Sequence, residues 1–377
     1  MDPNRRIAGL AVALAGAVTL SFTGAAQASA STAGAGGGAV AAGPQAGAAV
    51  RGTLNGVAAV SSREAWAVGS TAALEPLIVH WNGVRWLRAR TPLAKDGQLF
   101  GVASIYPSSA WAVGVDEGGT LILHWNGTAW HRVRSPSPGR RPALEAVAVI
   151  SSRSAWAVGY RYSTTNVQET LILHWNGTAW RQVRAPNPAE SELTGVSAVS
   201  STDAWAVGQT SSGPLLLRWN GISWKRVAGP KLPAASLYGV SVTSAHNAWA
   251  VGVRFGCPAV GCPLVLHWNG TAWKRAKTAN PASDPRGNWL FAVAAASGGT
   301  WAVGGTSVTS SSSMPLILRW NGTMWKLVRS PNPTGAVNLF GVAVTSARNA
   351  WAVGYPTSGT QYAVILHWNG TAWKRVL

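Results

Sequence analysis

The sequence predicts an all-β protein: a seven-bladed β-propeller with four antiparallel strands per blade. Three observations predict this fold. One pattern recurs from Leu54 to Leu377 at a spacing of about 46 residues, which lies within the 40 to 50 residues typical of propeller blades. Of the 22 tryptophans, 21 fall at three repeat positions, seven at each. No stretch shows the sustained 3.6-residue apolar period of an amphipathic helix.

Each repeat unit contains four segments that we expect to be strands. In the last unit, residues 339–377, they read LFGVAV, AWAVG, VILHW and TAWKRV. Asn-Gly joins the third segment to the fourth and is a strong hairpin signal, because a two-residue turn needs positive φ at both positions. The tryptophans do not alternate cleanly with polar residues, as expected for strands covered on both faces by neighbouring blades. We therefore assign them to packing between blades rather than to sugar binding.

The order G-V-x-x, A-W-A-V-G and H-W-N-G-T-A-W-K-R-V resembles the Kelch and galactose-oxidase-type propeller repeat over all seven units. In that repeat an apolar second strand ends in glycine, a long loop follows, and a short third strand turns into a Trp-bearing fourth. The resemblance implies that the first strand of each blade is innermost. The Gly pair typical of the second strand occurs here only at Gly304-Gly305, and nothing corresponds to the copper site of galactose oxidase.

Residues 1–30 have the pattern of a secretory signal peptide. Two arginines precede an apolar run from Ile7 to Phe22, and A-x-A triplets that end at Ala28 and Ala30 offer cleavage sites. An uncleaved anchor is the alternative, although a run of about 16 residues is short for a membrane span. We expect a secreted, extracellular protein with no membrane span after cleavage.

Residues 31–52 consist mainly of Ala, Gly and Ser and predict a flexible linker. Residues 54–377 then form the propeller, which we expect to be a monomer. Without residues 1–30 the chain carries 29 Lys and Arg against 11 Asp and Glu, a net charge of +18. Fifteen of these bases lie on or just after the fourth strand.

The fourth strand would be the outer edge of each blade, where Lys and Arg prevent edge-to-edge pairing of sheets. The functional alternative for these bases is adhesion to an anionic surface polymer, because a field of this sign attracts polyanions. We do not expect nucleic-acid binding, since the charge is spread around a perimeter and the chain carries an export signal.

Loop lengths indicate which face of the ring binds a ligand. The connections between strands one and two, and between strands three and four, keep nearly constant lengths. The connections between strands two and three, and those between units, vary. In a four-stranded meander the variable connections share one face, which we call the variable-loop face. Binding residues concentrate on loops held by a rigid scaffold. Of the 11 Asp and Glu residues that follow residue 30, nine also fall in these loops. The alternative explanation is that charged residues are common in loops of any protein.

The most specific candidate for a ligand-binding position is the residue that follows the leucine at the start of each first strand. In the seven units it is Asn55, Phe100, Glu145, Thr194, Tyr238, Phe291 and Phe340. With the first strand innermost, this position would ring the mouth of a central channel. Its aromatic and carboxylate side chains suit a sugar or a peptide side chain; the alternative is that the aromatic rings pack between blades.

The resulting ligand-binding candidates come from this ring and from the variable loops. They are Phe100, Glu145, Tyr238, Phe291, Phe340, Asp116, Glu117, Tyr160 and Tyr355. Tyr160 and Tyr355 directly follow the glycine that ends the second strand.

Cysteine and histidine positions indicate structural roles. Cys257 and Cys262 lie in one variable loop, and two cysteines this close in an exported chain predict a disulfide. Five of the seven histidines share one repeat position, which holds Arg218 and Arg319 in the other two units. Equivalent positions on separate blades are too far apart to share a metal, and Arg is no zinc ligand. We expect no metal and no cofactor.

No catalytic motif, such as G-x-S-x-G or H-E-x-x-H, is present. The sequence therefore favours a non-catalytic recognition module for extracellular carbohydrate or protein. The alternative is a carbohydrate-active hydrolase or lyase, in which two loop carboxylates such as Glu145 and Asp116 act as acid and base.

Overall fold

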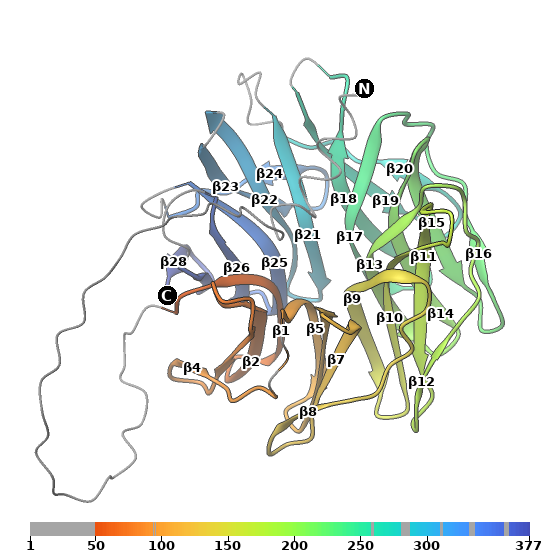
Figure 1. The fold of residues 1–377 in the computed structure, drawn as a ribbon. Coiled ribbons are helices and arrows are strands. Elements are labelled where there is room, and N and C mark those ends of the chain that lie inside the picture. The colour runs from red at the N-terminus through yellow and green to blue at the C-terminus, as the bar shows by residue number, and fades with distance from the viewer. Residues whose placement is uncertain are drawn as a thin grey trace, which may run out of the picture. The chain divides into compact units, whose positions relative to one another are not determined.

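The computed structural model describes residues 50–92, 94, 96–257, 260–279, 287–309, 312–331, 336–357 and 362–377. The predicted signal peptide, residues 1–30, and most of the predicted linker lie outside this part of the chain. The described residues form seven four-stranded antiparallel sheets and contain no α-helix (Figure 1). Among them there is consequently no helix long and apolar enough to span a membrane. The predicted all-β, seven-bladed propeller is confirmed.

Each blade is built from four consecutive strands. Blades 1 to 4 contain β1 (Thr53–Ser61), β2 (Glu64–Ser70), β3 (Pro76–Trp81), β4 (Trp86–Arg88); β5 (Gln98–Tyr106), β6 (Ser109–Asp116), β7 (Gly119–Trp125), β8 (Trp130–Arg132); β9 (Arg140–Ser151), β10 (Ser154–Tyr162), β11 (Gln168–Trp175), β12 (Trp180–Gln182); and β13 (Glu192–Ser200), β14 (Asp203–Thr210), β15 (Gly213–Trp219), β16 (Trp224–Arg226). Blades 5 to 7 contain β17 (Ala235–Ser244), β18 (Asn247–Arg254), β19 (Cys262–Trp268), β20 (Trp273–Arg275); β21 (Asn288–Ala296), β22 (Gly299–Thr309), β23 (Ser312–Trp320), β24 (Trp325–Leu327); and β25 (Val337–Ser346), β26 (Asn349–Pro356), β27 (Val364–Trp368), β28 (Trp373–Arg375).

The first strand of every blade faces the axis of the ring and the fourth strand lies outside (Figure 1). Blade 7 packs against blade 1, where Leu54 and Val57 share a core with Trp351 and Val353. Within the described residues each sheet consists of four consecutive strands, so the ring closes mainly by packing of side chains and without an exchanged strand. The only ladder contact recorded at this junction within the described residues is a single bridge between Arg51 and Tyr362.

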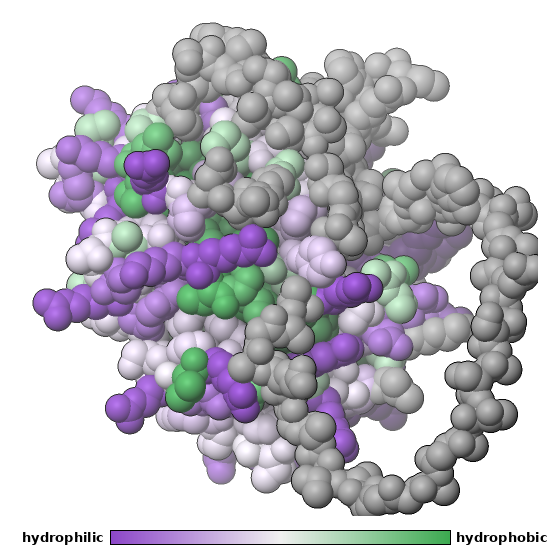
Figure 2. Space-filling model, turned by 90° about the vertical axis from the view of Figure 1, so that its left-hand side faces the viewer, coloured by the Kyte–Doolittle hydropathy of each residue, from purple (hydrophilic) through white to green (hydrophobic). Residues whose placement is uncertain are grey.

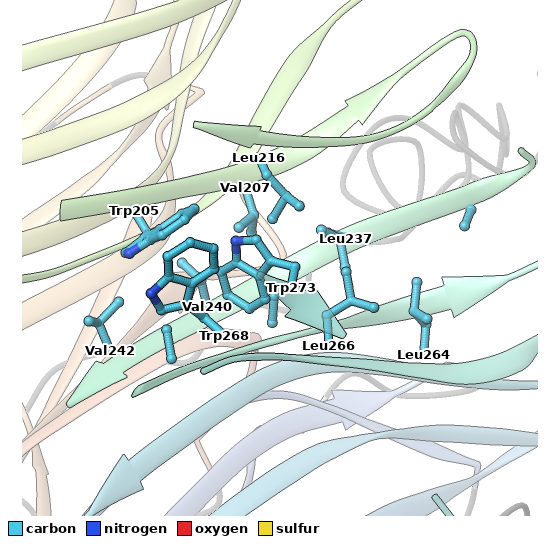
Figure 3. Packing of buried hydrophobic residues seen from close by; sticks show 13 residues of the cluster. Trp205, Val207, Leu216, Leu237, Val240, Val242, Leu264, Leu266, Trp268 and Trp273 are labelled. Carbon is cyan, nitrogen blue, oxygen red and sulfur yellow. The ribbon is translucent and has the colours of Figure 1, made fainter. Parts of the chain in front are cut away.

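The hydrophobic core is divided into seven clusters, each formed mainly by two adjacent blades. Figure 3 shows the cluster between blades 4 and 5, where Trp205 and Leu216 meet Leu237, Trp268 and Trp273. Because every blade repeats the same apolar positions, every boundary reproduces the same packing. This repetition stabilises the ring without a separate core at its centre.

The three repeated tryptophans meet at the boundaries between blades. Trp66 of blade 1 lies 5.0 Å from Trp125 and 5.2 Å from Trp130 of blade 2, measured between ring centroids. Trp351 of blade 7 stands in the same relation to blade 1, with distances of 4.9 Å to Trp81 and 5.1 Å to Trp86. The expected role of these indoles in packing between blades is confirmed.

The histidine or arginine of the third strand stacks on the first tryptophan of its own blade. His80 lies 4.2 Å from Trp66 between ring centroids, and the Arg218 guanidinium lies 5.3 Å from the ring of Trp205. Arg218 also donates hydrogen bonds to both carboxylate oxygens of Asp203, at 2.9 and 3.0 Å. The structural role predicted for this position is confirmed, because imidazole and guanidinium are both flat groups that suit an indole face.

The hairpin between the third and fourth strands differs from the predicted turn. The two flanking tryptophans pair directly, as in blade 2, so the loop has four residues rather than two. Within this loop only Gly127 has a positive φ, of 95°. The Asn126 side chain instead accepts hydrogen bonds from the backbone N–H groups of Thr128 and Ala129, both at 3.0 Å. The Asn-Gly pair therefore marks the hairpin through an Asx turn, and the expected two-residue turn is wrong.

The two cysteines form a disulfide between β18 and β19 in blade 5. The bond joins Cys257 to Cys262, as the sequence predicts. It closes the variable loop of this blade next to Gly261, and Gly261 lies close to the Trp289 ring.

Candidate functional site

Every first strand carries a β-bulge directly after its leading leucine. In blade 1, Leu54 pairs with Gly69 and the next pair is Gly56 with Val68, which leaves Asn55 unpaired. The same shift occurs in all seven blades. We call the bulged residues the bulge ring; they are Asn55, Phe100, Glu145, Thr194, Tyr238, Phe291 and Phe340. The repeat pattern of the sequence points to this position but gives no sign of the bulge.

Small residues at two positions accompany the bulge: glycine ends the second strand in every blade, and glycine, or alanine in blades 3 and 6, follows the bulged residue. A Cβ at Gly69, which ends the second strand, would collide with the carbonyl oxygen of Thr53. A Cβ at Gly56 would lie 2.8 Å from the carbonyl oxygen of Phe100, and one at Gly341 would lie 3.1 Å from that of Asn55. The innermost strands of neighbouring blades are therefore in backbone contact at these points, including across the closure from blade 7 to blade 1. A bulge redirects a side chain without ending the strand, so this arrangement sets where the ring residues point.

Most members of the bulge ring contact the next blade. The Asn55 amide donates a hydrogen bond of 2.8 Å to the carbonyl oxygen of Leu99. The Thr194 hydroxyl donates one of 2.8 Å to that of Leu237. The polar members of blades 1 and 4 therefore tie adjacent first strands together.

The aromatic members of blades 5 to 7 form a continuous stack. Ring centroids are 5.6 Å apart for Tyr238 and Phe291 and 4.9 Å apart for Phe291 and Phe340. Tyr355 of β26 continues the stack at 4.6 Å from Phe340, and burial raises its pKa to about 12. We call these four residues the aromatic arc. The rings do pack between blades, and the three bulged ones also keep part of their surface exposed.

Blades 3 and 4 bring two carboxyl groups to the same part of the ring. Burial, and then repulsion from Glu192, raise the pKa of Glu145 to about 8. Burial raises the pKa of Glu192 as well, although two hydrogen bonds partly offset this rise. These bonds come from the side-chain amides of Gln168 and Gln209, each at 2.6 Å. Glu192 is therefore fixed between the two blades, with both carboxylate oxygens occupied.

Three tyrosines lie close enough to these carboxyl groups to be affected by their charge. Burial and the charges of Glu145 and Glu192 raise the pKa of Tyr160; burial and the charge of Glu192 raise the pKa values of Tyr162 and Tyr238. Tyr160 and Tyr162 contact each other edge to face, with ring centroids 5.9 Å apart. We call the two glutamates and three tyrosines the Glu–Tyr cluster. It adjoins the aromatic arc through Tyr238.

The structure does not bring Asp116 to this cluster. One carboxylate oxygen of Asp116 lies 2.7 Å from a guanidinium nitrogen of Arg132 on the outer strand β8. The other accepts a hydrogen bond of 2.9 Å from the backbone N–H of Gly118. Glu117 is exposed in the same turn, and Phe100 is a partly exposed member of the bulge ring. The carboxylate that acts on Glu145 is therefore Glu192 rather than Asp116.

Glu192, Gln168, Gln209 and Tyr162 are site residues that the sequence analysis did not select. Glu192 directly precedes the leading leucine of its unit, where the other units have Thr, Gln, Ala, Ser, Trp and Asn. A single acid at an otherwise uncharged repeat position was therefore the available signal. The two glutamines carry no comparable signal, because their role depends on the contact between blades.

Comparison with known proteins identifies a fold class. No family model matches the chain, and no curated protein does. The structure of YCF48 bound to D1 peptide is similar, with a TM-score of 0.55 and 13% identity over 85% of this chain and 94% of that chain. The WD40 repeats of RRP9 match with a TM-score of 0.56 and 13% identity over 83% and 94% of the two chains. The β-propeller domain of the Trilobed protease from Pyrococcus furiosus matches with a TM-score of 0.50 and 10% identity over 87% and 98%.

At these identities the likeness shows the fold alone. The chain is a seven-bladed β-propeller whose solved neighbours include WD40 repeats. The closer resemblance to the Kelch type remains a prediction.

Proposed function

We propose that this protein is a secreted, non-catalytic recognition module that binds extracellular carbohydrate or protein through the bulge ring on its variable-loop face. One observation carries the proposal: seven blades place seven partly exposed side chains of differing chemistry at one unpaired position around the axis. Because a bulged residue has no partner in the ladder, its side chain can differ from blade to blade without disrupting the sheet. Such a scaffold suits recognition of many different ligands.

The aromatic arc and the Glu–Tyr cluster provide complementary binding chemistry. Phe291 and Phe340 offer apolar ring surface for a sugar or a side chain. Glu145 and Tyr160 offer polar groups beside it. A propeller of similar fold, YCF48, has been solved with a bound peptide, which supports the protein alternative for the ligand.

The assignment to the cell exterior rests on the N-terminal pattern and on the disulfide. Residues 1–30 would be the signal peptide, 31–52 the linker and 54–377 the propeller. Disulfides persist in oxidising compartments, and Cys257–Cys262 agrees with export. Near the end of the proposed linker, the Val50 carbonyl oxygen accepts a hydrogen bond of 2.9 Å from the Ala363 N–H of blade 7.

The outer strands support a second contact, with an anionic surface polymer. In six of the seven fourth strands the tryptophan is buried and the next two residues, mostly Lys or Arg, are exposed. Figure 2 shows hydrophilic side chains projecting from one side of the molecule, with hydrophobic ones visible between them. A basic perimeter of this kind attracts polyanions.

A carbohydrate-active hydrolase or lyase is the second candidate function, and Glu145 favours it. With a pKa of about 8 this side chain keeps its proton at neutral pH, as a general acid requires. Glu192 would be the second carboxylate, in place of Asp116.

Glycan and peptide arrays probed with residues 31–377 test the proposal. Tyr238→Ala should weaken binding at least tenfold, because it removes a ring shared by the arc and the cluster. Tyr106→Ala is the matched control, since this tyrosine is 52% exposed in the hairpin between β5 and β6, on the opposite face. Equal binding by both variants would exclude the bulge ring as the site. Turnover of an array glycan that is lost in Glu145→Gln would establish the enzyme instead.

A further inference from the structure

Glu145 differs from the other polar members of the bulge ring. Asn55 and Thr194 each donate a hydrogen bond to the neighbouring blade. In the part of the chain that the structure describes, no hydrogen bond or ion pair reaches the Glu145 side chain, although it is set deeply enough for burial to be the main cause of its raised pKa. It nevertheless keeps a small exposed surface. The protein has thus placed a carboxyl group at the inner ring without providing its partner.

The surroundings of Glu145 are negative and aromatic. Tyr160 pairs with Ala143 in the ladder beside the bulge at Glu145, and its ring centroid lies 5.9 Å from that of Tyr162. Tyr162 pairs with Gln168, whose side-chain amide donates a hydrogen bond to Glu192. Glu192 repels Glu145 and also acts on Tyr238, so Tyr160, Tyr162 and Tyr238 complete the cluster. These are three of the six tyrosines in the chain. Arg161 of β10 lies 2.9 Å from Glu169. The charge of Arg141 of β9 acts on Tyr162 at the edge of the cluster and is not among the causes of the raised pKa of Glu145. A desolvated carboxyl beside tyrosine rings is the environment that recognises an organic cation.

We propose that Glu145, with the rings of Tyr160, Tyr162 and Tyr238, binds an alkylammonium group of the ligand. This inference rests on the proposed function and names its ligand class. An ammonium group donates hydrogen bonds to the free carboxylate oxygens of Glu145 and offsets the charge of Glu192. Its methylene groups contact the tyrosine rings. A lysine side chain of a protein and an amino sugar share this chemistry.

Other charged ligands fit less well. A metal ion would need several oxygen or nitrogen ligands, and the described residues include no group of three His, Cys, Asp or Glu that could hold one. Both oxygens of Glu192 are already occupied by Gln168 and Gln209. An anion would be repelled by two carboxyl groups.

The test uses residues 31–377 labelled with ¹³C in the tyrosine rings, so that each of the six tyrosines reports separately. The probe is n-butylammonium chloride at pH 8.5, with n-butanol and sodium chloride at the same concentrations as controls. Signals of the three cluster tyrosines should shift saturably with butylammonium alone, while those of Tyr106 and Tyr362 stay unchanged. Glu145→Gln should lower the affinity at least tenfold. Glu75→Gln, an exposed acid in the loop between β2 and β3, should leave it unchanged.

Three results would overturn the inference. Equal shifts with n-butanol would show that the cluster binds an apolar group without regard to charge, and the proposed function would stand. Unchanged affinity in Glu145→Gln would remove the carboxyl group from the site. Absence of saturable shifts with butylammonium would exclude the cation, while array binding that depends on Tyr238 would still support a recognition module. N-acetylglucosamine and glucosamine, then acetyl-lysine and lysine amides, distinguish an amino sugar from a protein ligand.

Discussion

Replacing Glu145 by Gln should stabilise the protein by an amount that grows as the pH rises from about 4.5 to about 8 and then stays constant. A rise of the Glu145 pKa from its ordinary 4.5 to about 8 corresponds to roughly 5 kcal/mol at 1.36 kcal/mol per pH unit. Part of the side chain is exposed, so solvent screening reduces this, and we expect about 2–4 kcal/mol. The native state keeps the proton up to about pH 8 and the unfolded chain releases it near 4.5, so stability falls as pH rises through this window. Gln has the shape of the protonated acid and cannot ionise.

Urea unfolding of both proteins at pH 5, 7 and 9, followed by tryptophan fluorescence, measures this difference. At pH 5 the two free energies of unfolding should agree within about 1 kcal/mol, and at pH 9 the variant should be more stable by about 2–4 kcal/mol. Glu75→Gln controls for loss of a carboxyl group in general and should change stability by less than about 0.5 kcal/mol at either pH. A difference between Glu145→Gln and the wild type that is independent of pH would refute the reasoning, since it could not arise from ionisation.

Three further predictions concern the scaffold. Trp351→Ala removes an indole that is 1% exposed at the closure of the ring and should cost about 3–5 kcal/mol in urea unfolding; a loss below about 1 kcal/mol would mean that blades 7 and 1 are not tightly packed. Arg218→Lys keeps the charge but loses the two-point contact with Asp203 and the stacking on indole, so a decrease of about 1–2 kcal/mol is expected by the same assay. Reduction of Cys257–Cys262, whose cysteines are five positions apart, should cost about 2 kcal/mol, visible as a lower Tm with reductant; an unchanged Tm would show that this loop adds nothing to stability.

The fold was predictable because each blade repeats the same local and inter-blade constraints. The position of Trp66, for example, recurs at a fixed distance from its leading leucine in nearly every unit. One packing solution for one boundary then applies to all seven, including the closure at Trp351. A shifted closure, in which the N-terminal strands would complete a blade begun by the C-terminal strands, is compatible with the repeat but does not occur, because β1 pairs within its own four-stranded sheet.

The site was only partly predictable, because its chemistry arises between blades. The repeat alignment found Glu145, Tyr160 and Tyr238 but gave no sign that Glu192 lies with them, since residues 145 and 192 are brought together only by the ring. It also paired Glu145 with Asp116 on the basis of their shared face. Asp116 instead forms an ion pair with Arg132, and the repeat pattern gives no sign of this single contact.

The seven blades differ from one another in two physically distinct ways. Where Arg218 replaces the usual histidine, Asp203 stands opposite it and forms two hydrogen bonds, so one change is matched by another within the blade. A bulged residue has no paired residue opposite it in the ladder of its own sheet, so its side chain can be selected by contacts with groups in other blades. For Phe291 those groups are the neighbouring rings. Glu145 has no such group among the described residues, which is why we propose that a ligand from outside the chain supplies it.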